Sequence, residues 1–267
     1  MISGNLSIYD LRRETLTRVT FGGRPAGLST WAPDGKHIAY RAKGNAGYGL
    51  YWIRADGAGQ EQQLLKSDRN MVPWSFSPDG RLLAYNEVNE ETGKFDLLLL
   101  PLELTDPEHP KPGAPQLVLR TRANQNMAAF SPNGHWIGYR SDETGNNEMY
   151  VLPFPGLKGK WQISNGGALY MFWSNNGREL FYETLDNRIM MVEYTASGDS
   201  FSSSKPRLWS DIQLLNPGVL NGALHPDGKR FAVFPRPESA GGEKQSAHVT
   251  FMLNFFDELR RRVPVSK

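Results

Sequence analysis

A ten-residue motif occurs five times along this chain and restricts its fold more than any other feature of the sequence. Each copy joins an apolar or aromatic residue, a Pro-Asp-Gly turn or a variant of it, and a run that ends in apolar, small and aromatic positions. The copies are WAPDGKHIAY from Trp31, FSPDGRLLAY from Phe76, FSPNGHWIGY from Phe130, WSNNGRELFY from Trp173 and LHPDGKRFAV from Leu224. Their spacing runs from the low forties to the mid fifties of residues. A repeat of this length with strand, turn and strand character predicts a β-propeller.

The centre of the motif has the chemistry of a tight turn between two strands. Pro sets φ to about −65° at the first central position, and the following Asp or Asn can bond to the local backbone. Gly then supplies the positive φ that returns the chain. The sequence therefore predicts equivalent turns at Gly35, Gly80, Gly134, Gly177 and Gly228.

The strand after each turn alternates large and small residues. The large apolar positions are Ile38, Leu83, Ile137, Leu180 and Phe231. The next position is small in four copies, at Ala39, Ala84, Gly138 and Ala232, and is Phe181 in the remaining copy. The position after that is Tyr40, Tyr85, Tyr139, Tyr182 or Val233. Because successive strand residues face opposite sides, each blade should present a large face and a small face to its neighbours.

Two outer strands are predicted after each hairpin. They are Tyr48–Arg54 and Glu61–Lys66, Phe95–Leu102 and Gln116–Arg120, Glu148–Pro153 and Lys160–Ser164, and Arg188–Tyr194 and Pro206–Asp211. The fifth copy has only a third strand, His248–Asn254, while LSIYDL from Leu6 and LTRVTF from Leu16 resemble the outer strands of another blade. Pairing these termini would close the ring without a free edge. We expect one all-β domain over residues 1–267 with five four-stranded blades, or alternatively six blades of which one is partial.

Composition limits the partners and the compartment. The net charge is +2 and the pI about 8.7, which is too mild to predict nucleic-acid binding. No cysteine occurs, so disulfides, thiol nucleophiles and cysteine metal sites are excluded. No apolar run is long enough for membrane insertion, and no signal peptide is visible at the N-terminus. The chain as it stands would be cytoplasmic, or periplasmic or extracellular if it belongs to a longer membrane-anchored protein.

The sequence offers no catalytic, metal-binding or cofactor motif. The histidines, which are His37, His109, His135, His225 and His248, lack the spacing of metal ligands. We expect Asp34, Asp79 and Asp227 to form turns, because Asn replaces Asp in the other two motif copies. Trp31, Trp74 and Trp173 could stack on a sugar or peptide, but two of them stand in or beside the motif, which favours core packing. The run Arg260–Arg262 could form a basic contact patch, but we expect a solvated C-terminal turn with Asp257 and Glu258 as local partners.

A ligand would most simply bind where the innermost strands begin, at the end of the channel opposite the Pro-Asp-Gly turns. The residues expected at this funnel mouth are Arg24, Arg69, Asn70, Asn124, Gln125, Asn126, Tyr170, Met171 and Asn221. The loops between second and third strands, including Arg140–Glu143, are expected to share the same rim. Guanidinium, amide and phenol groups without a carboxylate suit a small polar or anionic ligand, or a protein surface that carries such groups. The alternative is a water-filled mouth that binds nothing.

The repeated Ser-Pro-Asp-Gly motif with its flanks resembles the TolB-type propeller family. IYDLRRETLTRVTF from Ile8, EMYVLPFPGLKGKWQIS from Glu148 and FMLNFFDELRRRVP from Phe251 are similar to the WD-like propeller that forms the C-terminal sensor region of some bacterial serine/threonine kinases. The chain lacks the Gly-rich loop, the His-Arg-Asp loop and the Asp-Phe-Gly motif of a kinase domain. The resemblance therefore implies sensing or interaction and no kinase activity.

Three functions are compatible with these observations. The first is a non-catalytic propeller that acts as a sensor or as a module for protein or ligand interaction. The second is an enzyme of the lyase or lactonase type that uses the axial funnel, and the third is a truncated structural fragment of a larger propeller protein. A fold alone does not choose among them.

Overall fold

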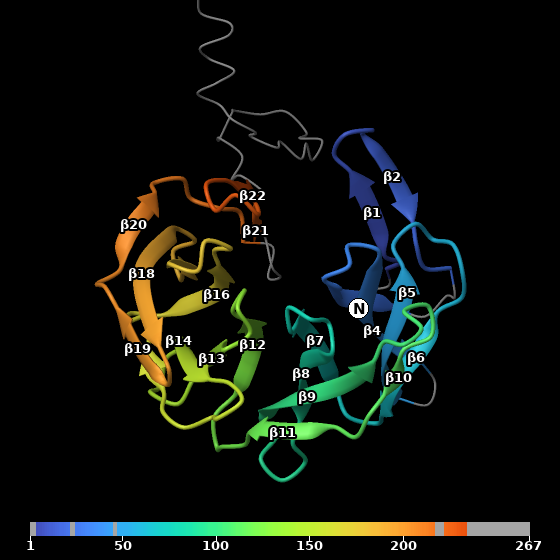
Figure 1. Ribbon diagram of the computed structural model, residues 1–267, viewed down its shortest axis with the longest axis horizontal. Helices are drawn as coiled ribbons and strands as arrows, with labels where there is room; N and C mark the ends of the chain where they lie inside the picture. The colour runs from blue at the N-terminus through green and yellow to red at the C-terminus, as the bar shows by residue number, and fades with distance from the viewer. Residues whose placement is uncertain (1–3, 22–24, 45–46, 217–221, 234–267) are drawn as a thin grey trace, which may run out of the picture.

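The computed structural model describes residues 4–21, 25–44, 47–216 and 222–233, and these residues form β-strands and connecting loops without a helix. Antiparallel sheets follow one another around a central axis, with β7, β12, β16 and β21 toward the middle (Figure 1). We call each sheet a blade and number it by the motif copy that it contains. This arrangement is that of a β-propeller, as the repeats predict.

The blades have the following strands. Blade one contains β3 (Ala26–Trp31), β4 (His37–Gly44), β5 (Gly47–Arg54) and β6 (Gln62–Ser67). Blade two contains β7 (Met71–Phe76), β8 (Leu82–Val88), β9 (Phe95–Glu103), β10 (Lys111–Pro112) and β11 (Gln116–Leu119). Blade three contains β12 (Gln125–Phe130), β13 (Trp136–Ser141), β14 (Glu148–Pro153) and β15 (Trp161–Gln162). Blade four contains β16 (Ala168–Trp173), β17 (Glu179–Thr184), β18 (Ile189–Ser197), β19 (Ser200–Ser203) and β20 (Arg207–Ser210). Blade five contains β21 (Gly222–Leu224) and β22 (Phe231–Val233) among the described residues.

Two blades depart from the simple four-strand expectation. In blade two, β10 and β11 both pair with β9, and in blade four β19 and β20 both pair with β18. The third strands β9 and β18 each have nine residues, which is long enough to hold two short partners end to end. Strand β10 arises inside the Pro-rich segment 105–115, and Lys111 there forms an ion pair with Glu103 at 3.6 Å. Proline is tolerated in β10 because this strand lies at the sheet edge.

The predicted turns are confirmed at all five motif copies. Each turn glycine has a positive φ: 65° at Gly35, 74° at Gly80, 74° at Gly134, 66° at Gly177 and 69° at Gly228. The side chain of the Asp or Asn before this glycine accepts a hydrogen bond from the backbone N–H of the residue after the glycine. The donor is Lys36 for Asp34 (2.8 Å) and His135 for Asn133 (3.1 Å), and the other three copies form the same bond. These side chains therefore form the turns, as expected.

Large and small faces meet between neighbouring blades. Ala39 of blade one lies in the same buried cluster as Leu83 of blade two, and Ala84 of blade two lies with Ile137 of blade three. A Cβ built at Gly138 would lie 1.7 Å from Met171 Cε, so this position leaves room for blade four. The large-to-small packing expected from the sequence is confirmed at these junctions.

The exception at Phe181 has its own partners. Its ring packs edge-on against Phe231 of blade five and Trp209 of β20, with ring centroids 5.5 and 5.7 Å apart. Because both partners are large aromatic rings, a small residue at this position would leave a void between blades four and five.

The first motif residue shows where a neighbouring sheet is incomplete. Phe76 and Phe130 are 7% and 8% exposed because each packs against the preceding blade, whereas the equivalent Trp31 is 50% exposed. The expectation that Trp31 belongs to the core is therefore wrong. On that side of blade one the described residues provide only a hairpin, β1 (Ser7–Asp10) and β2 (Thr15–Arg18).

The β1–β2 hairpin confirms the strands predicted near the N-terminus. Leu6, Ile8 and Val19 from this segment pack against Ile38 and Tyr40 of blade one. The predicted partner His248–Asn254 lies outside the described residues, and so does the predicted turn at Arg260–Arg262. Ring closure, the number of blades and a single domain over residues 1–267 therefore stay predictions.

Candidate functional site

Most of the predicted ligand-binding residues that the structure describes lie at one edge of the sheets, where inner strands begin and second strands end. Arg69 and Asn70 precede β7, Asn124 precedes β12, and Gln125 and Asn126 begin β12. Tyr170 lies in β16, and Arg24 and Asn221 lie outside the described residues. The expectation for Met171 is wrong, because this residue of β16 is buried between blades three and four against Gly138. We call this edge the rim. Cross-strand pairs such as Asn126 with Arg140 and Met71 with Glu87 bring the ends of the second strands to the same edge.

In blade one the rim is built around Arg41 of β4. Its Nη1 donates to Oδ1 of Asn70 at 2.9 Å, which links blade one to the start of the innermost strand of blade two. The guanidinium also lies over the Tyr48 ring, 5.9 Å from the ring centroid. Burial lowers the pKa of Arg41, but arginine remains a cation at any physiological pH. Asn70 is therefore held in place by a fixed positive charge.

The equivalent residue of blade two is Asn86, which is fully buried. Its Nδ2 donates to the carbonyl of Asp96 at 2.8 Å and to the carbonyl of Gln125 in blade three, while its Oδ1 accepts the indole N–H of Trp74. Gln125 is itself buried and donates to the hydroxyl of Ser141 at 3.2 Å. The Gln125 side chain is therefore part of the junction between blades rather than a free contact group.

The equivalent residue of blade three is Arg140, which interacts with two of the predicted residues, Asn126 and Tyr170. Its Nε donates to Oδ1 of Asn126 at 2.9 Å and its Nη1 donates to the carbonyl of Leu169 at 3.1 Å. Burial lowers the pKa of Arg140, against the opposing effects of Tyr170 and Asp142. Burial likewise raises the pKa of Tyr170, so its phenol stays protonated and can donate a hydrogen bond. The result is a fixed group of one amide, one guanidinium and one phenol.

The sequence contained a signal for these linking residues that the motif comparison did not use. Arg41, Asn86, Arg140 and Glu183 each follow the tyrosine of their motif copy directly. In blades one to three this residue bonds to the start of the next inner strand. A polar residue after an otherwise apolar strand indicates such a role, because a buried polar group needs a partner.

Carboxylates also lie at the rim, although the predicted set contains none. Glu87 Oε2 lies 3.0 Å from Arg69 Nη2, and both oxygens of Asp142 accept from Asn124 at 2.7 Å. Burial raises the pKa of Asp142, but the hydrogen bonds from Asn124 outweigh it and hold that pKa below its usual value. The rim therefore presents paired charges rather than a purely basic surface.

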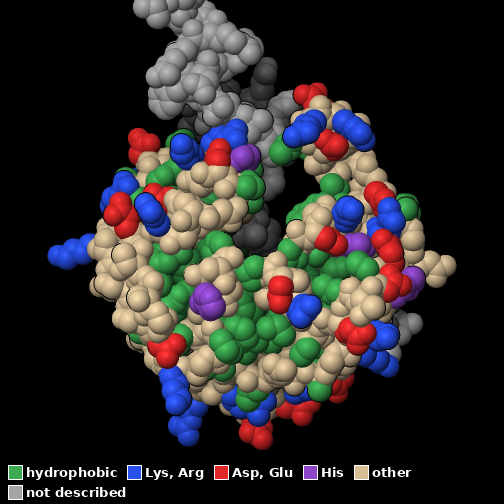
Figure 2. All heavy atoms as spheres, in the orientation of Figure 1, with side chains coloured by type: hydrophobic (Ala, Val, Ile, Leu, Met, Phe, Trp, Pro, Cys, Tyr) green, Lys and Arg blue, Asp and Glu red, His purple; other side chains and the backbone are tan. Residues whose placement is uncertain are grey.

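This arrangement is suited to hydrogen-bonded recognition. No group of three His, Asp or Glu side chains that could hold a metal ion occurs within the described ranges. On the face shown in Figure 2, side chains of both charges are spread around the periphery instead of gathering into one basic patch. No helix of the described part is long and apolar enough to cross a bilayer.

Known proteins resemble the chain in structure rather than in sequence. No protein-family model and no curated protein matches it. TolB from Acinetobacter baumannii is 17% identical over 88% of this chain and 60% of that protein, with a TM-score of 0.54. A puromycin-hydrolyzing peptidase from Mycobacterium tuberculosis is 14% identical over 79% of this chain and 36% of that protein, with a TM-score of 0.56.

A third similar structure is a candidate 6-phosphogluconolactonase from Bacteroides uniformis. It is 14% identical over 90% of this chain and 76% of that protein, with a TM-score of 0.51. The chain thus spans 60% of the length of TolB and about a third of the peptidase. At these identities the comparisons show a TolB-like β-propeller fold, and a fold is shared by proteins of unrelated activity.

Proposed function

From the TolB-like fold and the geometry of the rim, we propose that this chain is a non-catalytic propeller that binds a protein or a small polar or anionic ligand. The observation that carries the proposal is the fixed position of the rim donors. Arg41, Asn86 and Arg140 each bond to the next blade, so the polar groups around them are ordered before any ligand arrives. Groups held in place in advance lose less entropy on binding.

Charge states at the rim also support binding over acid–base catalysis. The pKa of Asp142 is lowered by its hydrogen bonds in spite of burial, and the pKa of Tyr170 is raised by burial. Both shifts move the pKa away from neutral pH, whereas a general acid or base works best with a pKa near the working pH. If the rim instead belonged to a lyase or lactonase, the purified chain would turn over substrates in a panel of esters and polysaccharides.

Arg69 is the rim arginine best placed to meet a ligand. Its side chain is 38% exposed, and within the described part of the chain it forms one ion pair, between Nη2 and Glu87 Oε2 at 3.0 Å. The remaining N–H groups can donate to a carboxylate or carbonyl of a partner. The test is binding of a fluorescein-labelled library of acidic peptides with free carboxyl termini to the wild type and to the double variant R69A/N126A.

We expect the double variant to bind the selected peptides with a free energy weaker by roughly 1–3 kcal/mol, the range for a lost charge-assisted hydrogen bond. A matched control is Arg207→Ala, because Arg207 is exposed and pairs with Glu193 at 3.8 Å, and Glu193 lies beside Glu179 at the opposite edge of blade four, where the second strand begins. Equal binding by the wild type and the double variant would place the binding surface elsewhere and overturn the proposal for the rim.

A sensing role extends this proposal. The similarity of three stretches of the chain to the sensor propellers of bacterial serine/threonine kinases supports it. An in-frame kinase domain encoded directly upstream of Met1 is the expected finding. An upstream region that encodes an unrelated protein in another frame would leave an interaction module without a kinase.

A further inference from the structure

The sequence contains four Asn-Gly pairs, and three of them lie within the described residues, at Asn133, Asn165 and Asn176. In such a pair the backbone nitrogen of Gly can approach the side-chain amide of Asn, because glycine has no side chain in the way. Asparagine is accordingly one of the residues that limit the chemical stability of proteins on heating. The surroundings of the three pairs differ, and these differences decide which pair reacts.

The pairs at Asn133 and Asn176 are held in motif turns. Each Oδ1 accepts the backbone N–H of the residue after the glycine, at 3.1 and 2.9 Å respectively. The N–H of each glycine donates to the backbone carbonyl of Ser131 or Ser174, at 2.9 and 3.1 Å. A carbonyl oxygen does not take up the proton of an amide, so these glycine nitrogens have no base beside them.

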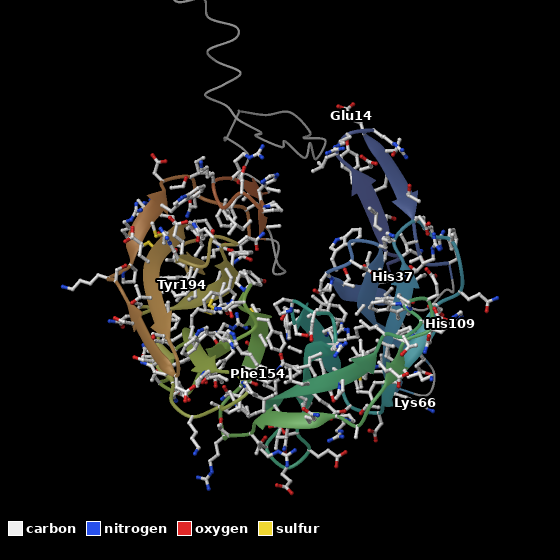
Figure 3. The ribbon with its side chains drawn as sticks, in the orientation of Figure 1. Glu14, His37, Lys66, His109, Phe154 and Tyr194 are labelled. Atoms are coloured by element: carbon white, nitrogen blue, oxygen red, sulfur yellow. The ribbon has the colours of Figure 1, made fainter. Side chains whose placement is uncertain are left out.

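Asn165 lies in a different environment, in the linker between β15 and β16. It is exposed, and its side chain forms no hydrogen bond within the described part of the chain. Gly166 and Gly167 follow with φ of 98° and 97°, which glycine adopts readily. A Cβ built at Gly166 would meet no atom within 4 Å, so the pair is open to water. In Figure 3 the blades on either side are marked by Phe154, which follows β14, and by Tyr194 of β18.

The backbone nitrogen of Gly166 is hydrogen-bonded to a carboxylate. Glu148, the first residue of β14, is buried, and its Oε1 accepts the N–H of Gly166 at 2.9 Å and that of Gly167 at 2.8 Å. Its Oε2 accepts the hydroxyl of Ser164, so both oxygens are held in place. A general base needs a separation of roughly 2.6–3.2 Å from the atom whose proton it takes. Oε1 of Glu148 meets this requirement for Gly166.

We propose that Asn165 is a modification site, which is converted to aspartate and isoaspartate with Glu148 as the base. Glu148 Oε1 takes the proton of the Gly166 N–H, and the nitrogen attacks Cγ of Asn165. Because the N–H bond lies in the plane of the peptide group, the hydrogen bond to Glu148 leaves the face of the nitrogen free for Cγ.

The remaining steps consume water and release ammonia. The proton passes from Glu148 through water to Nδ2 of Asn165, the bond from Cγ to Nδ2 breaks, and ammonia leaves a cyclic succinimide. Water then adds to either carbonyl of this ring, and the Gly166 nitrogen regains a hydrogen as the ring opens. Opening at one carbonyl gives aspartate, and opening at the other gives isoaspartate, in which the main chain runs through the side chain of residue 165.

The isoaspartate product changes the junction between blades three and four. It inserts a methylene carbon into the main chain ahead of Gly166, so the N–H groups of Gly166 and Gly167 lose their register with Glu148. The same segment leads to Leu169, whose carbonyl accepts Nη1 of Arg140 at 3.1 Å. The modification therefore acts on a contact that orders the rim, but it occurs whether or not the rim binds a ligand.

The test is incubation of the full chain at neutral pH, followed by peptide mass spectrometry that separates asparagine, aspartate and isoaspartate. We expect Asn165 to be converted about tenfold faster than Asn133 and Asn176 in the same molecules. Glu148→Gln keeps an acceptor oxygen and the side-chain volume but removes the base, so conversion at Asn165 should slow about tenfold. Asp96→Asn is the matched control, because Asp96 is the buried carboxylate at the equivalent position of β9 and should leave the rate at Asn165 unchanged.

The free peptide Trp161–Tyr170 gives a second measurement that needs no variant to fold. It contains the same Asn-Gly pair without Glu148, so we expect conversion to be slower in the peptide than in the folded chain. Conversion in the peptide at the same rate or faster would overturn the role of Glu148, and so would an unchanged or faster rate in Glu148→Gln. Equal rates at the three asparagines, or no conversion at Asn165, would overturn the site itself. None of these outcomes bears on peptide binding at the rim.

Discussion

At the scale of single residues, the motif explains both what is buried and what is left exposed. Phe130 occupies the same motif position as Trp31, but Phe130 has blade two beside it and Trp31 has only the β1–β2 hairpin. A side chain contributes to stability in proportion to the apolar area that it removes from water. Equivalent sequence positions therefore differ in energy because their neighbours differ.

This difference predicts unequal effects of truncation. Phe130→Ala should lower the free energy of unfolding by about 3–5 kcal/mol, the range for a buried Phe, and Trp31→Ala by about 1 kcal/mol or less. Urea denaturation followed by circular dichroism measures both values. An equally large loss for Trp31→Ala would show that this ring is covered in solution, as it would be by a complete neighbouring blade.

Asp142 predicts a pH dependence of stability. Burial raises its pKa, but hydrogen bonds from Asn124 lower it overall, so the folded-state pKa lies below the ordinary value of 3.8. The ionised carboxylate therefore stabilises the fold above pH 3.8, and this contribution disappears as the pH falls through the lower folded-state pKa. We expect Asp142→Asn to be less stable than the wild type at pH 7 and the two curves to converge on acidification. Parallel curves from pH 7 to pH 3 would contradict the assignment.

At the scale of the elements, the hairpin β1–β2 acts as a cover for blade one. It places Leu6, Ile8 and Val19 against Ile38 and Tyr40, which would otherwise face water. The backbone N–H of Val19 also donates to the carbonyl of Leu6 at 2.8 Å, which holds the two strands together beyond their paired residues.

Deletion of Met1–Phe21 should therefore lower the melting temperature and promote aggregation, since it uncovers an apolar face and a strand edge. Differential scanning calorimetry and light scattering measure the two effects. Leu16→Ala is the control, because Leu16 is exposed on the same hairpin and its removal should leave both unchanged. An unaltered melting temperature after the deletion would mean that the hairpin does not contribute to the core.

The sequence was sufficient for the turns, the inner hairpins and the outer strands, because these depend on local chemistry: Gly at positive φ, Asp or Asn beside it, and alternating large and small residues. It was insufficient for β10 and β19, whose partners β9 and β18 are long enough to pair twice. It placed the loop Arg140–Glu143 at the rim but was insufficient for the contacts made there, because Glu87 and Asp142 meet Arg69 and Asn124 only once neighbouring elements are assembled.

At the scale of the whole molecule, each blade is joined to the next by a repeated pair of features. One is the hydrophobic contact between a large face and a small face, and the other is the polar link from a second strand to the next inner strand. Contacts therefore run mainly between neighbours, as in other repeat proteins. In such a molecule, loss of one polar link should destabilise only the strands at that junction, unless the ring couples all the blades.

Arg140→Ala tests this locality. The change removes the hydrogen bonds to Asn126 and to the carbonyl of Leu169, so it loosens the junction between blades three and four. We expect amide hydrogen exchange to become about tenfold faster or more in β12, β13 and β16, which corresponds to a local loss of about 1.4 kcal/mol, and to stay unchanged in β4 and β5 of blade one. Mass spectrometry of peptic fragments resolves these strands. Acceleration of similar size in β4 and β5 would contradict nearest-neighbour coupling and would instead indicate a closed ring that opens as one unit.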